Sequence, residues 1–522
     1  MTYLFPAGAQ QGQSVEVKVG DASAWPVQIW VSDPALTASP AEEKGKLAIA
    51  VADAAPPGVY WLRLYNEEGA TSLRPFLVGT LPEAAETEPN DTHSQPQTLE
   101  SPNVTLNGVL SKSGDVDSFA LSLTAGQTLV ASLEANGRLG SPLDAVLQIV
   151  SPDGFVLEQN DEYHDVDPQI VFTVPDDGRY LVRLFAFPTD PNSTIGFAGR
   201  ESYVYRLTLT TGGFVDHAYP LAISHDGTAP VRLEGWNVPA DLDTVAVQPG
   251  ADATTAIAEP PLANFTQVRV EPHPTAIEQE PNDGAADANH FTLPQTITGR
   301  IESPGDVDVF RFPATKGQAL RFAVESRELG FPLDAVLRLL DASGRELKRV
   351  DDSGRRTRDA VLDFTAPDDG EYLVEVSDLH DTGGFRYVYR LRAVQPEPDY
   401  ALAVEADHFV LTVGKPSEVP VAIDRKDGFK EAVEIAAEGL PEGVTIEPAS
   451  SPAEGDAAKS VKLKLSATMP TAGASIRIVG RVTSQPALAR TAEASLADFH
   501  TTTQQLWLTV VKVEEKSEKA TE

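Results

Sequence analysis

Two stretches of the chain are dense in oxygen-bearing side chains, and each occurs twice. Glu86–Asp91 reads ETEPND and is followed by Gly114–Phe119, which reads GDVDSF. Glu278–Asp283 (EQEPND) and Gly305–Phe310 (GDVDVF) repeat both stretches about 190 residues later. Each copy gathers five carboxylates and the amide of one asparagine, with no cysteine and no histidine. The chemistry open to such a set is the binding of a cation through oxygen.

The spacing within each stretch favours convergence of these side chains. Glu86 and Glu88 are two residues apart, and Pro89 disfavours the helical region for Glu88 and makes it extended. In an extended chain, residues two apart project to the same side, so both carboxylates can face one point. Asp115 and Asp117 share a side by the same rule.

Phe119 has the same parity as these two aspartates, and one face of a regular strand cannot be both ionic and apolar. We therefore predict that Gly114–Asp117 lies at the mouth of a strand and that burial begins at Phe119. Phe310 and Phe312 repeat this pattern in the second copy.

Five carboxylates held close together repel one another unless a cation lies among them or some of them stay protonated. Ligation by oxygen alone selects a hard ion. Calcium accepts about six to eight such ligands in flexible geometry, whereas magnesium requires a tighter octahedron that keeps waters. Zinc is disfavoured because histidine and cysteine are absent from the cluster. We therefore expect two Ca²⁺ sites; the alternative is a pair of acidic surface turns without metal.

The order E-x-E-P-N-D followed by G-D-x-D-x-F resembles the bacterial pre-peptidase C-terminal (PPC) domain, a family similar to the collagen-binding domain of secreted bacterial collagenases. Further blocks extend the resemblance to about half the chain: Pro142–Leu147 with Pro332–Leu337, Pro175–Gly178 with Pro367–Gly370, and Tyr203–Leu207 with Tyr387–Leu391.

The resemblance implies a jelly-roll-like β-sandwich that holds calcium between an N-terminal segment and the start of a strand. It also implies the ligand positions, which are Glu86, Glu88, Asn90, Asp91, Asp115 and Asp117 in the first copy and Glu278, Glu280, Asn282, Asp283, Asp306 and Asp308 in the second.

Composition narrows the classes of function. A net charge of −36 over 522 residues leaves no basic footprint for nucleic acid and disfavours an anionic membrane surface. No run of about 18 apolar residues is present, so no membrane span is expected. Cysteine is absent, which excludes disulfides, although a secreted protein can be stabilised by metal instead.

The chain start, Met1–Pro6, enters the first strand region without a visible signal peptide. The sequence is therefore trimmed, internal to a longer product, or cytoplasmic. Extracellular calcium modules bind at roughly 10⁻⁴–10⁻³ M and would be largely empty in the cytosol. We expect a secreted, periplasmic or cell-surface protein whose start has been trimmed.

Short alternating segments between Gly, Pro, Asp and Asn turns predict an all-β chain of tandem β-sandwiches; examples are Ser14–Val19, Lys46–Val51, Asp117–Leu123 and Ala145–Val150. We predict these domains: 1–80 an immunoglobulin-like sandwich, 81–213 the first calcium-binding jelly-roll, 214–275 a small β module or spacer, 276–395 the second jelly-roll, 396–513 an immunoglobulin-like sandwich, and 514–522 a disordered tail.

Several aromatic residues in these strand patterns have two interpretations. Trp30 and Trp61 suit either core packing or ligand stacking. Tyr205 and its counterpart Tyr389 suit either the core, with the hydroxyl bonded to a neighbouring loop, or a ligand-binding aromatic face of the kind that the collagenase resemblance implies.

Asp144, Asp161 and Glu162 recur as Asp334, Asp351 and Asp352. They suit either further cation sites or turn caps, which are the commoner role of aspartate.

No catalytic motif is present: there is no G-x-S-x-G elbow, no H-E-x-x-H and no P-loop, and the nine histidines are scattered. We expect a non-catalytic, extracellular, calcium-binding scaffold or adhesion-type binding protein whose partner is an extracellular protein or polysaccharide polymer. The alternative is the accessory, substrate-binding portion of a secreted peptidase or other hydrolase. The sequence sets no oligomeric state.

Overall fold

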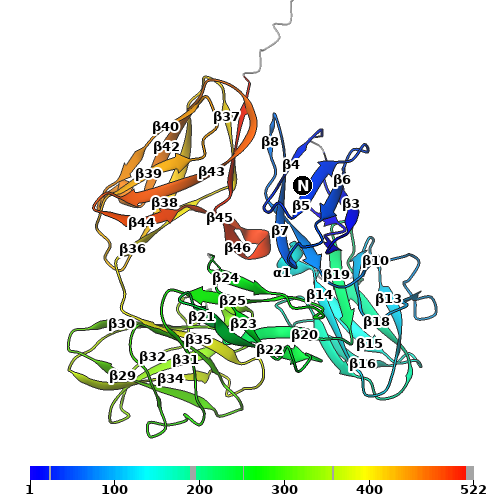
Figure 1. Ribbon diagram of the computed structural model, residues 1–522, viewed down its shortest axis with the longest axis horizontal. Coiled ribbons are helices and arrows are strands. Elements are labelled where there is room, and N and C mark those ends of the chain that lie inside the picture. The colour runs from blue at the N-terminus through cyan, green and yellow to red at the C-terminus, as the bar shows by residue number, and fades with distance from the viewer. Residues whose placement is uncertain (23–24, 188–195, 251, 355–357, 513–522) are drawn as a thin grey trace, which may run out of the picture. The chain divides into compact units, whose positions relative to one another are not determined.

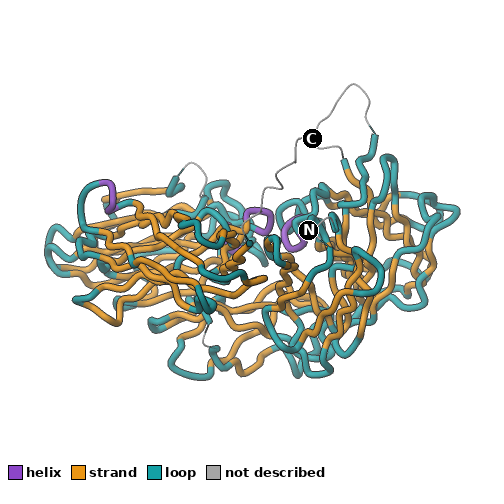
Figure 2. The backbone as a smooth tube through the Cα atoms, turned by 90° about the horizontal axis from the view of Figure 1, so that it is seen from above, coloured by secondary structure: helices purple, strands orange, loops and turns teal. Residues whose placement is uncertain are grey.

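A computed structural model describes residues 1–22, 25–187, 196–250, 252–354 and 358–512. The described residues form strands β1 to β47, one four-residue helix and three short 3₁₀ turns, so the predicted all-β class is confirmed (Figures 1 and 2). None of the described helices has the length and apolar character that a membrane crossing requires. The predicted tail, 514–522, lies outside the described residues.

The chain divides into two compact units. One consists of Met1–Leu209 together with Pro398–Glu522, and the other of Thr210–Glu397. The strands of each unit pair into sheets, and each pair of sheets encloses its own apolar core.

The first sandwich packs two sheets around Val17, Leu47, Leu62 and Phe76. One sheet has the order β1 (Leu4–Phe5), β3 (Ser14–Val19), β6 (Lys46–Val51), β5 (Leu36–Pro40). The other has the order β2 (Gly8–Gln10), β9 (Arg74–Gly79), β7 (Gly58–Asn66), β4 (Gln28–Val31), with β8 (Gly69–Ala70) paired to β7. In β3 and β6, every second residue is apolar and points inward, as the sequence predicted.

The second sandwich contains the first acidic copy. One sheet has the order β10 (Glu83–Ala85), β12 (Val104–Val109), β19 (Val204–Thr210), β14 (Thr128–Glu134), β17 (Gln169–Thr173). The other has the order β11 (Gln97–Thr98), β13 (Asp117–Leu123), β18 (Gly178–Ala186), β15 (Ala145–Val150), β16 (Val156–Asn160), and helix α1 (Asn136–Leu139) follows β14. Phe119, Leu121 and Leu123 face the core, where Phe119 lies opposite Val182.

The second unit begins with a small sandwich of two three-stranded sheets. Their orders are β20 (Phe214–Tyr219), β22 (Ala229–Trp236), β23 (Thr244–Val247), and β21 (Ala222–Ser224), β25 (Thr266–Glu271), β24 (Thr254–Ile257). Val231, Leu233 and Val268 form its core.

The second copy repeats the strand order of the first. One sheet has the order β26 (Thr275–Ile277), β28 (Gln295–Arg300), β35 (Val388–Val394), β30 (Ala319–Glu325), β33 (Val361–Thr365). The other has the order β27 (Asn289–His290), β29 (Val307–Ala314), β34 (Gly370–Asp378), β31 (Ala335–Asp341), β32 (Glu346–Val350). The 3₁₀ turn η1 (Arg327–Leu329) stands where α1 stands in the first copy.

The last sandwich pairs two larger sheets around Leu402, Val421, Ile435 and Leu508. The first has the order β40 (Val444–Glu447), β42 (Ser460–Ala467), β38 (Ser417–Lys426), β36 (Asp399–Val404), β45 (Glu493–Leu496), β46 (Thr501–Thr503). The second has the order β37 (His408–Thr412), β47 (Leu506–Val511), β43 (Thr471–Val482), β39 (Val433–Glu438), β41 (Ala449–Ser451), with β44 (Gln485–Thr491) on β43. Turns η2 (Asp456–Ala458) and η3 (Ala497–Phe499) complete it.

Candidate metal centres

Two backbone segments bring the acidic side chains of the first copy together. β10 pairs in parallel with β12, and the Glu86 N–H, just after β10, donates to the Asn107 carbonyl at 2.9 Å. Asp117 is the first residue of β13, and Asp115 lies in the turn before it. The chain end of one sheet and the strand start of the other therefore meet at one end of the sandwich.

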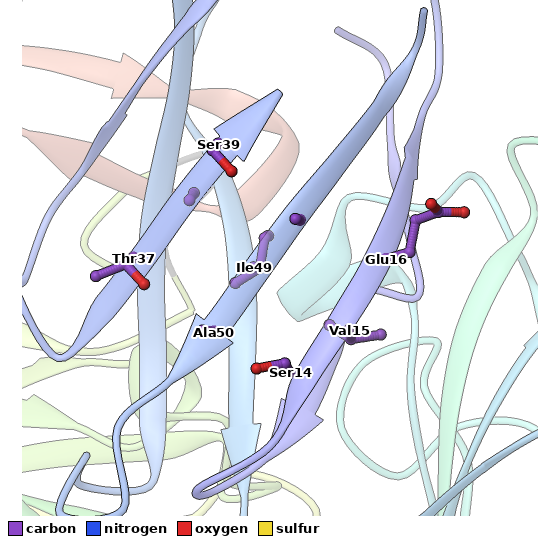
Figure 3. A pocket seen from close by; sticks show the side chains of 9 residues that line it. Ser14, Val15, Glu16, Thr37, Ser39, Ile49 and Ala50 are labelled. Atoms are coloured by element: carbon purple, nitrogen blue, oxygen red, sulfur yellow. The ribbon is translucent and has the colours of Figure 1, made fainter. Parts of the chain in front are cut away.

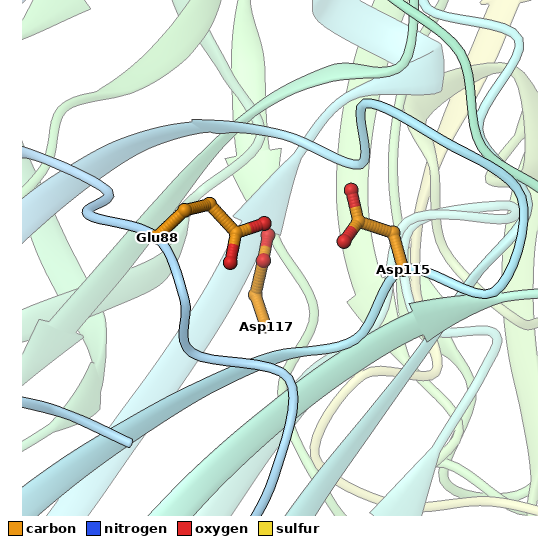
Figure 4. Close-up of side chains that lie close together, drawn as sticks. All are labelled: Glu88, Asp115 and Asp117. Carbon is orange, nitrogen blue, oxygen red and sulfur yellow. The ribbon is translucent and has the colours of Figure 1, made fainter. Parts of the chain in front are cut away.

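The carboxylates converge on one point. Glu88, Asp115 and Asp117 each place one oxygen within 4.8 Å of the others, and Figure 4 shows the three side chains turned toward one another. In the second copy the trio is Glu278, Glu280 and Asp308, in which Glu278, the counterpart of Glu86, takes the place of Asp306, the counterpart of Asp115. Each trio contains three of the six predicted ligands of its copy.

Burial in the first copy starts earlier than we predicted. Asp115 and Asp117 are both 0% exposed, so burial does not begin at Phe119. The acidic pair does lie at the strand mouth, where Glu88 of a distant segment places an oxygen within 4.8 Å of both carboxylates. Parity along β13 could not reveal this cover, because it comes from residues far away in sequence.

Several buried oxygen atoms of the two clusters lack a hydrogen-bond partner among the described residues. They are Asn90 Oδ1, Asp91 Oδ1, Asp115 Oδ1 and Asp117 Oδ1 in the first copy and Asn282 Oδ1 and Asp308 Oδ1 in the second. A buried polar atom without a partner costs about 1–3 kcal/mol, and more when it is charged. Two of these oxygens recur unpaired at equivalent positions, in Asn90 and Asn282 and in Asp117 and Asp308, which fits a site for an oxygen-liganded divalent cation.

The remaining predicted ligands lie around these trios. Glu86 reaches the first cluster through Tyr205, and Glu88 Oε2 accepts the Asn90 N–H at 2.9 Å. Asn90 and Asn282 are fully buried, Asp91 and Asp306 are partly buried, and Asp283 is exposed. Glu280 Oε2 accepts the Asn282 N–H at 2.8 Å, which repeats the local turn.

The hydroxyl of a buried tyrosine is hydrogen-bonded to each cluster. The Tyr205 hydroxyl lies 2.5 Å from Asp117 Oδ2 and 3.1 Å from Glu86 Oε2. The Tyr389 hydroxyl lies 2.6 Å from Asp308 Oδ2 and 3.3 Å from Glu278 Oε2. Both rings are buried, so the core interpretation is correct and the aromatic-face interpretation is wrong for these two residues. The hydroxyl bonds the acidic cluster and not a neighbouring loop.

Glycine makes room for each tyrosine. A Cβ atom on Gly108 would lie 2.1 Å from the Tyr205 hydroxyl, and one on Gly299 would lie 2.3 Å from the Tyr389 hydroxyl. The two positions face each other across β12 and β19, and across β28 and β35. Sequence reasoning missed this pair, although a glycine in the middle of a strand signals close approach of a neighbouring group.

Burial changes the acidity of the clusters. Desolvation raises the pKa of Glu86 and, with the nearby Glu86 charge, raises the pKa of Asp117 well above its usual value. Burial raises the pKa of Glu278 to about 8 and that of Asp306 to about 6, and it also raises the pKa of Asp308. The raised carboxyl groups of each cluster therefore hold their protons more tightly than free carboxyl groups do.

The two copies differ at one charged position. Lys112 Nζ lies 3.5 Å from Asp91 Oδ2, 3.7 Å from Asp115 Oδ1 and 4.0 Å from Glu88 Oε1. The corresponding residue of the second copy is Ser303. The first cluster thus carries a cationic side chain where the second has a neutral hydroxyl.

The second set of recurring acids does not assemble into a cluster. Among the described residues, only the two trios above bring three ligand atoms within 4.8 Å. Asp161, Glu162, Asp351 and Asp352 are exposed, whereas Asp144 is partly buried and Asp334 is buried, each just before a strand.

Two other aspartates serve as turn caps. Asp167 accepts the N–H groups of Ala135, Asn136 and Gly137, and Asp359 accepts those of Ser326, Arg327 and Glu328. Burial raises the pKa of Asp167 to about 6.

One histidine is buried among charges in the second unit. His217 Nδ1 lies 2.8 Å from Asp216 Oδ2, and its Nε2 lies 3.3 Å from Glu234 Oε2. Although burial lowers the His217 pKa, hydrogen bonds to these two carboxylates outweigh it, and the pKa is raised. Phe331 and Phe385 of the second copy pack on the His217 ring, so this charged group lies at the junction between the small sandwich and the second copy.

A shallow hollow of about 390 Å³ lies over β3, β5 and β6 of the first sandwich (Figure 3). Small side chains such as Ser14, Thr37, Ser39 and Ala50 line it, and Glu16 is the one ionisable residue among the described residues of its wall. These side chains form no group that could perform chemistry.

The structure thus defines a class: a two-sheet β-sandwich, present twice, with a buried oxygen-only cluster at one end. The bacterial pre-peptidase C-terminal domain family matches residues 115–186 and 306–378, so the chain contains two copies of this domain, as the sequence resemblance predicted.

Comparison with curated proteins finds a probable subtilase-type serine protease of Deinococcus radiodurans, which is 36% identical over 104 residues. The match covers 19% of this chain and 14% of the protease.

Among solved structures, the pre-peptidase C-terminal domain of a Bacillus anthracis collagenase matches 22% of this chain and 99% of its own, with 19% identity and a TM-score of 0.18. Fibronectin(III)-like modules of Clostridium thermocellum CbhA match 45% of this chain and 95% of their own, with 10% identity and a TM-score of 0.15. At these scores the structural likenesses carry no further argument.

Proposed function

We propose that the chain is a non-catalytic, extracellular binding protein or scaffold that holds one Ca²⁺ in each PPC copy. The observation that carries this proposal is the recurrence, in both copies, of buried carboxylate and amide oxygens that have no hydrogen-bond partner among the described residues. A hard cation is the partner that such oxygens lack, and calcium tolerates the irregular arrangement of the ligands better than magnesium does.

Calcium would neutralise the buried carboxylates and join two segments that the chain brings together. Glu86, Glu88, Asn90 and Asp91 lie in the segment between β10 and β11, whereas Asp117 begins β13 and Asp115 lies just before it. Tyr205 would keep Asp117 and Glu86 oriented. Since the ion binds only the assembled site, it would stabilise the folded state by mass action.

Calorimetric titration of the metal-free protein with Ca²⁺ tests the proposal. We expect two equivalents for the parent chain and one for Glu88→Ala or Glu280→Ala. Glu158→Ala removes an exposed carboxylate of β16, away from the cluster, and should leave two. Loss of no equivalent in either ligand variant, or no binding by the parent, would reject the proposal.

The second candidate is the accessory portion of a secreted peptidase. The match to part of a probable subtilase-type serine protease favours it, and PPC domains occur in secreted peptidases beside a separate catalytic domain. In this case the chain binds a protein polymer that a linked enzyme cleaves.

Sedimentation with insoluble protein and polysaccharide polymers distinguishes the two candidates. Capture by a protein polymer alone favours the accessory role, whereas capture by polysaccharide, or by neither, favours the scaffold. Turnover of any of these polymers by the purified chain would contradict both.

A further inference from the structure

The last sandwich of the chain lies against the first within one compact unit, although hundreds of residues separate them. Phe499, at the end of η3, is 9% exposed, and its ring packs edge-on against Trp61 with centroids 5.3 Å apart. The Arg74 guanidinium lies 5.1 Å from the same ring, and Leu73 and Leu496 complete an apolar cluster. We refer to Leu496–Phe499 as the plug.

A buried ion pair stands beside the plug. Arg63 of β7 and Asp407, which precedes β37, are 1% and 4% exposed and lie 2.8 Å apart (Nη2 to Oδ2). Asp407 also accepts the Leu73 N–H at 3.1 Å, and Arg63 donates to the Gln505 carbonyl at 3.3 Å. Within their own sandwiches, Arg63 Nη1 donates to the Thr71 carbonyl at 3.0 Å, and Asp407 Oδ1 lies 2.9 Å from His408 Nδ1. Arg63 Nη2 and Asp407 Oδ2 are paired across the two sandwiches.

Aromatic residues on the surface of the first sandwich face the last one. Trp507 lies 4.6 Å from Tyr65 and 6.3 Å from Trp30, centroid to centroid, and β8 lies against β37 and β47 (Figure 1). Trp30 and Trp61 thus pack against residues of the last sandwich and not in the core of their own. The interface holds three of the five tryptophans of the chain.

The first PPC copy also lies against the plug. Gly140, which ends α1, has a φ of 62°, and a Cβ atom there would lie 2.8 Å from Phe499 Cε1 and 3.1 Å from the Asp498 carbonyl oxygen. Gly330 is its counterpart after η1 and has a φ of 86°, but no described residue lies within 4 Å of its Cβ position. Of these two glycines, the one in the first copy therefore makes room for the plug.

We propose that the last sandwich is an intramolecular clamp. Its plug docks in the socket formed by β7, β9 and the α1 turn, and the Arg63–Asp407 pair selects this arrangement. Because an unpaired buried charge is strongly unfavourable, any docking that separates the pair is disfavoured. The docked aromatic face is closed to outside ligands, and the first sandwich, the first PPC copy and the last sandwich move as one body.

The absence of cysteine allows a direct test in the full chain. Glu42→Cys and Glu442→Cys, both at exposed positions of the first and last sandwiches, accept a pair of spin labels without other sites reacting. We expect a single narrow distance distribution by pulsed electron paramagnetic resonance. Gly140→Ala and Asp407→Asn should broaden it at least twofold and shift tryptophan emission to longer wavelength.

Gly330→Ala is the matched control, because it imposes the same backbone strain without reaching the plug. Circular dichroism must show that the variants keep their β structure; Asp407→Asn preserves side-chain shape and serves where Gly140→Ala fails to fold. Equal distributions for Gly140→Ala and Gly330→Ala, with Asp407→Asn also unchanged, overturn the proposal. So does a broad distribution in the parent, or a doubled mass that shows docking between two chains.

Discussion

If each PPC copy holds one Ca²⁺, as proposed above, exchanging one residue between the two copies should exchange their calcium affinities. Lys112 Nζ lies within 3.5–4.0 Å of three carboxylates of the first cluster, and Ser303 holds that position in the second. A calcium ion and the lysine compete for the same negative charge, so the ion must displace the ammonium group. We therefore predict that the first site binds calcium more weakly than the second.

The size of the effect follows from the three ion pairs. The Lys112 side chain is 59% exposed, so solvent screens each pair. An exposed ion pair changes an equilibrium constant by a factor of roughly 1.5 to 5. Removal of all three pairs at once gives a change of about tenfold. Lys112→Ser should therefore lower the calcium dissociation constant of the first site about tenfold, and Ser303→Lys should raise that of the second by a similar factor.

Single-site backgrounds make the measurement clean. Lys112→Ser is titrated in the Glu280→Ala chain, where only the first site remains, and Ser303→Lys in the Glu88→Ala chain. Arg138→Ser removes a positive charge from the first copy away from the cluster and controls for net charge. The difference should shrink at 1 M salt, where the screening length falls to about 3 Å. Unchanged or weaker binding by Lys112→Ser, at low salt, would refute the competition.

Two further predictions concern buried polar groups. Tyr205→Phe leaves buried Asp117 Oδ2 without its donor, so urea unfolding of the metal-free protein should show a loss of about 1–3 kcal/mol; a loss below about 0.5 kcal/mol would contradict this role of the hydroxyl. The raised pKa of His217 contributes stability that is complete below its unfolded pKa of about 6.5 and is lost as pH rises through the folded value. The melting temperature of the Thr210–Glu397 unit should therefore decrease as the pH is raised from 6 to 9, and His217→Gln should make this decrease smaller. An equal decrease in the variant would count against a stabilising role of His217 at the junction. Glu234, whose pKa is lowered to about 2, stays ionised throughout this range.

Strands with a strong alternating pattern were predictable to the residue. β3, β6, β13 and β15 begin and end where the sequence placed them, because each alternates or buries apolar residues over six or seven positions. The short strands β10 and β11 were missed. They contain two or three residues and exist only because they pair in parallel with β12 and β13, which no local pattern reports.

The candidate site divides in the same way. Residue type and spacing indicated carboxylates that can face one point, because parity is a local property of an extended chain, and three carboxylates in each copy do converge. The Tyr205 hydroxyl, the Gly108 opening and the Lys112 ion pairs depend on which distant segments meet. Of these, the glycine in the middle of β12 was the one signal present in the sequence.

The repeating unit of the chain extends beyond the PPC domain. In the first copy Leu139 of α1 packs against Ala7 and Leu77 of the preceding sandwich. In the second copy Leu329 of η1 packs against Tyr219 and Leu221 of the small sandwich.

The backbone around these two packing sites also corresponds. The Leu77 N–H donates to the Ala7 carbonyl, and the Arg269 N–H donates to the Leu221 carbonyl, in two parallel strand pairs. The charges differ, because Arg206 of β19 binds Glu83 of β10, whereas Arg390 at the same position of β35 binds Glu271 of β25. A sandwich followed by a PPC domain is therefore the unit that occurs twice. A chain that lacks residues 1–80 would expose Leu139 and should unfold more readily than one that keeps both the first sandwich and the PPC domain.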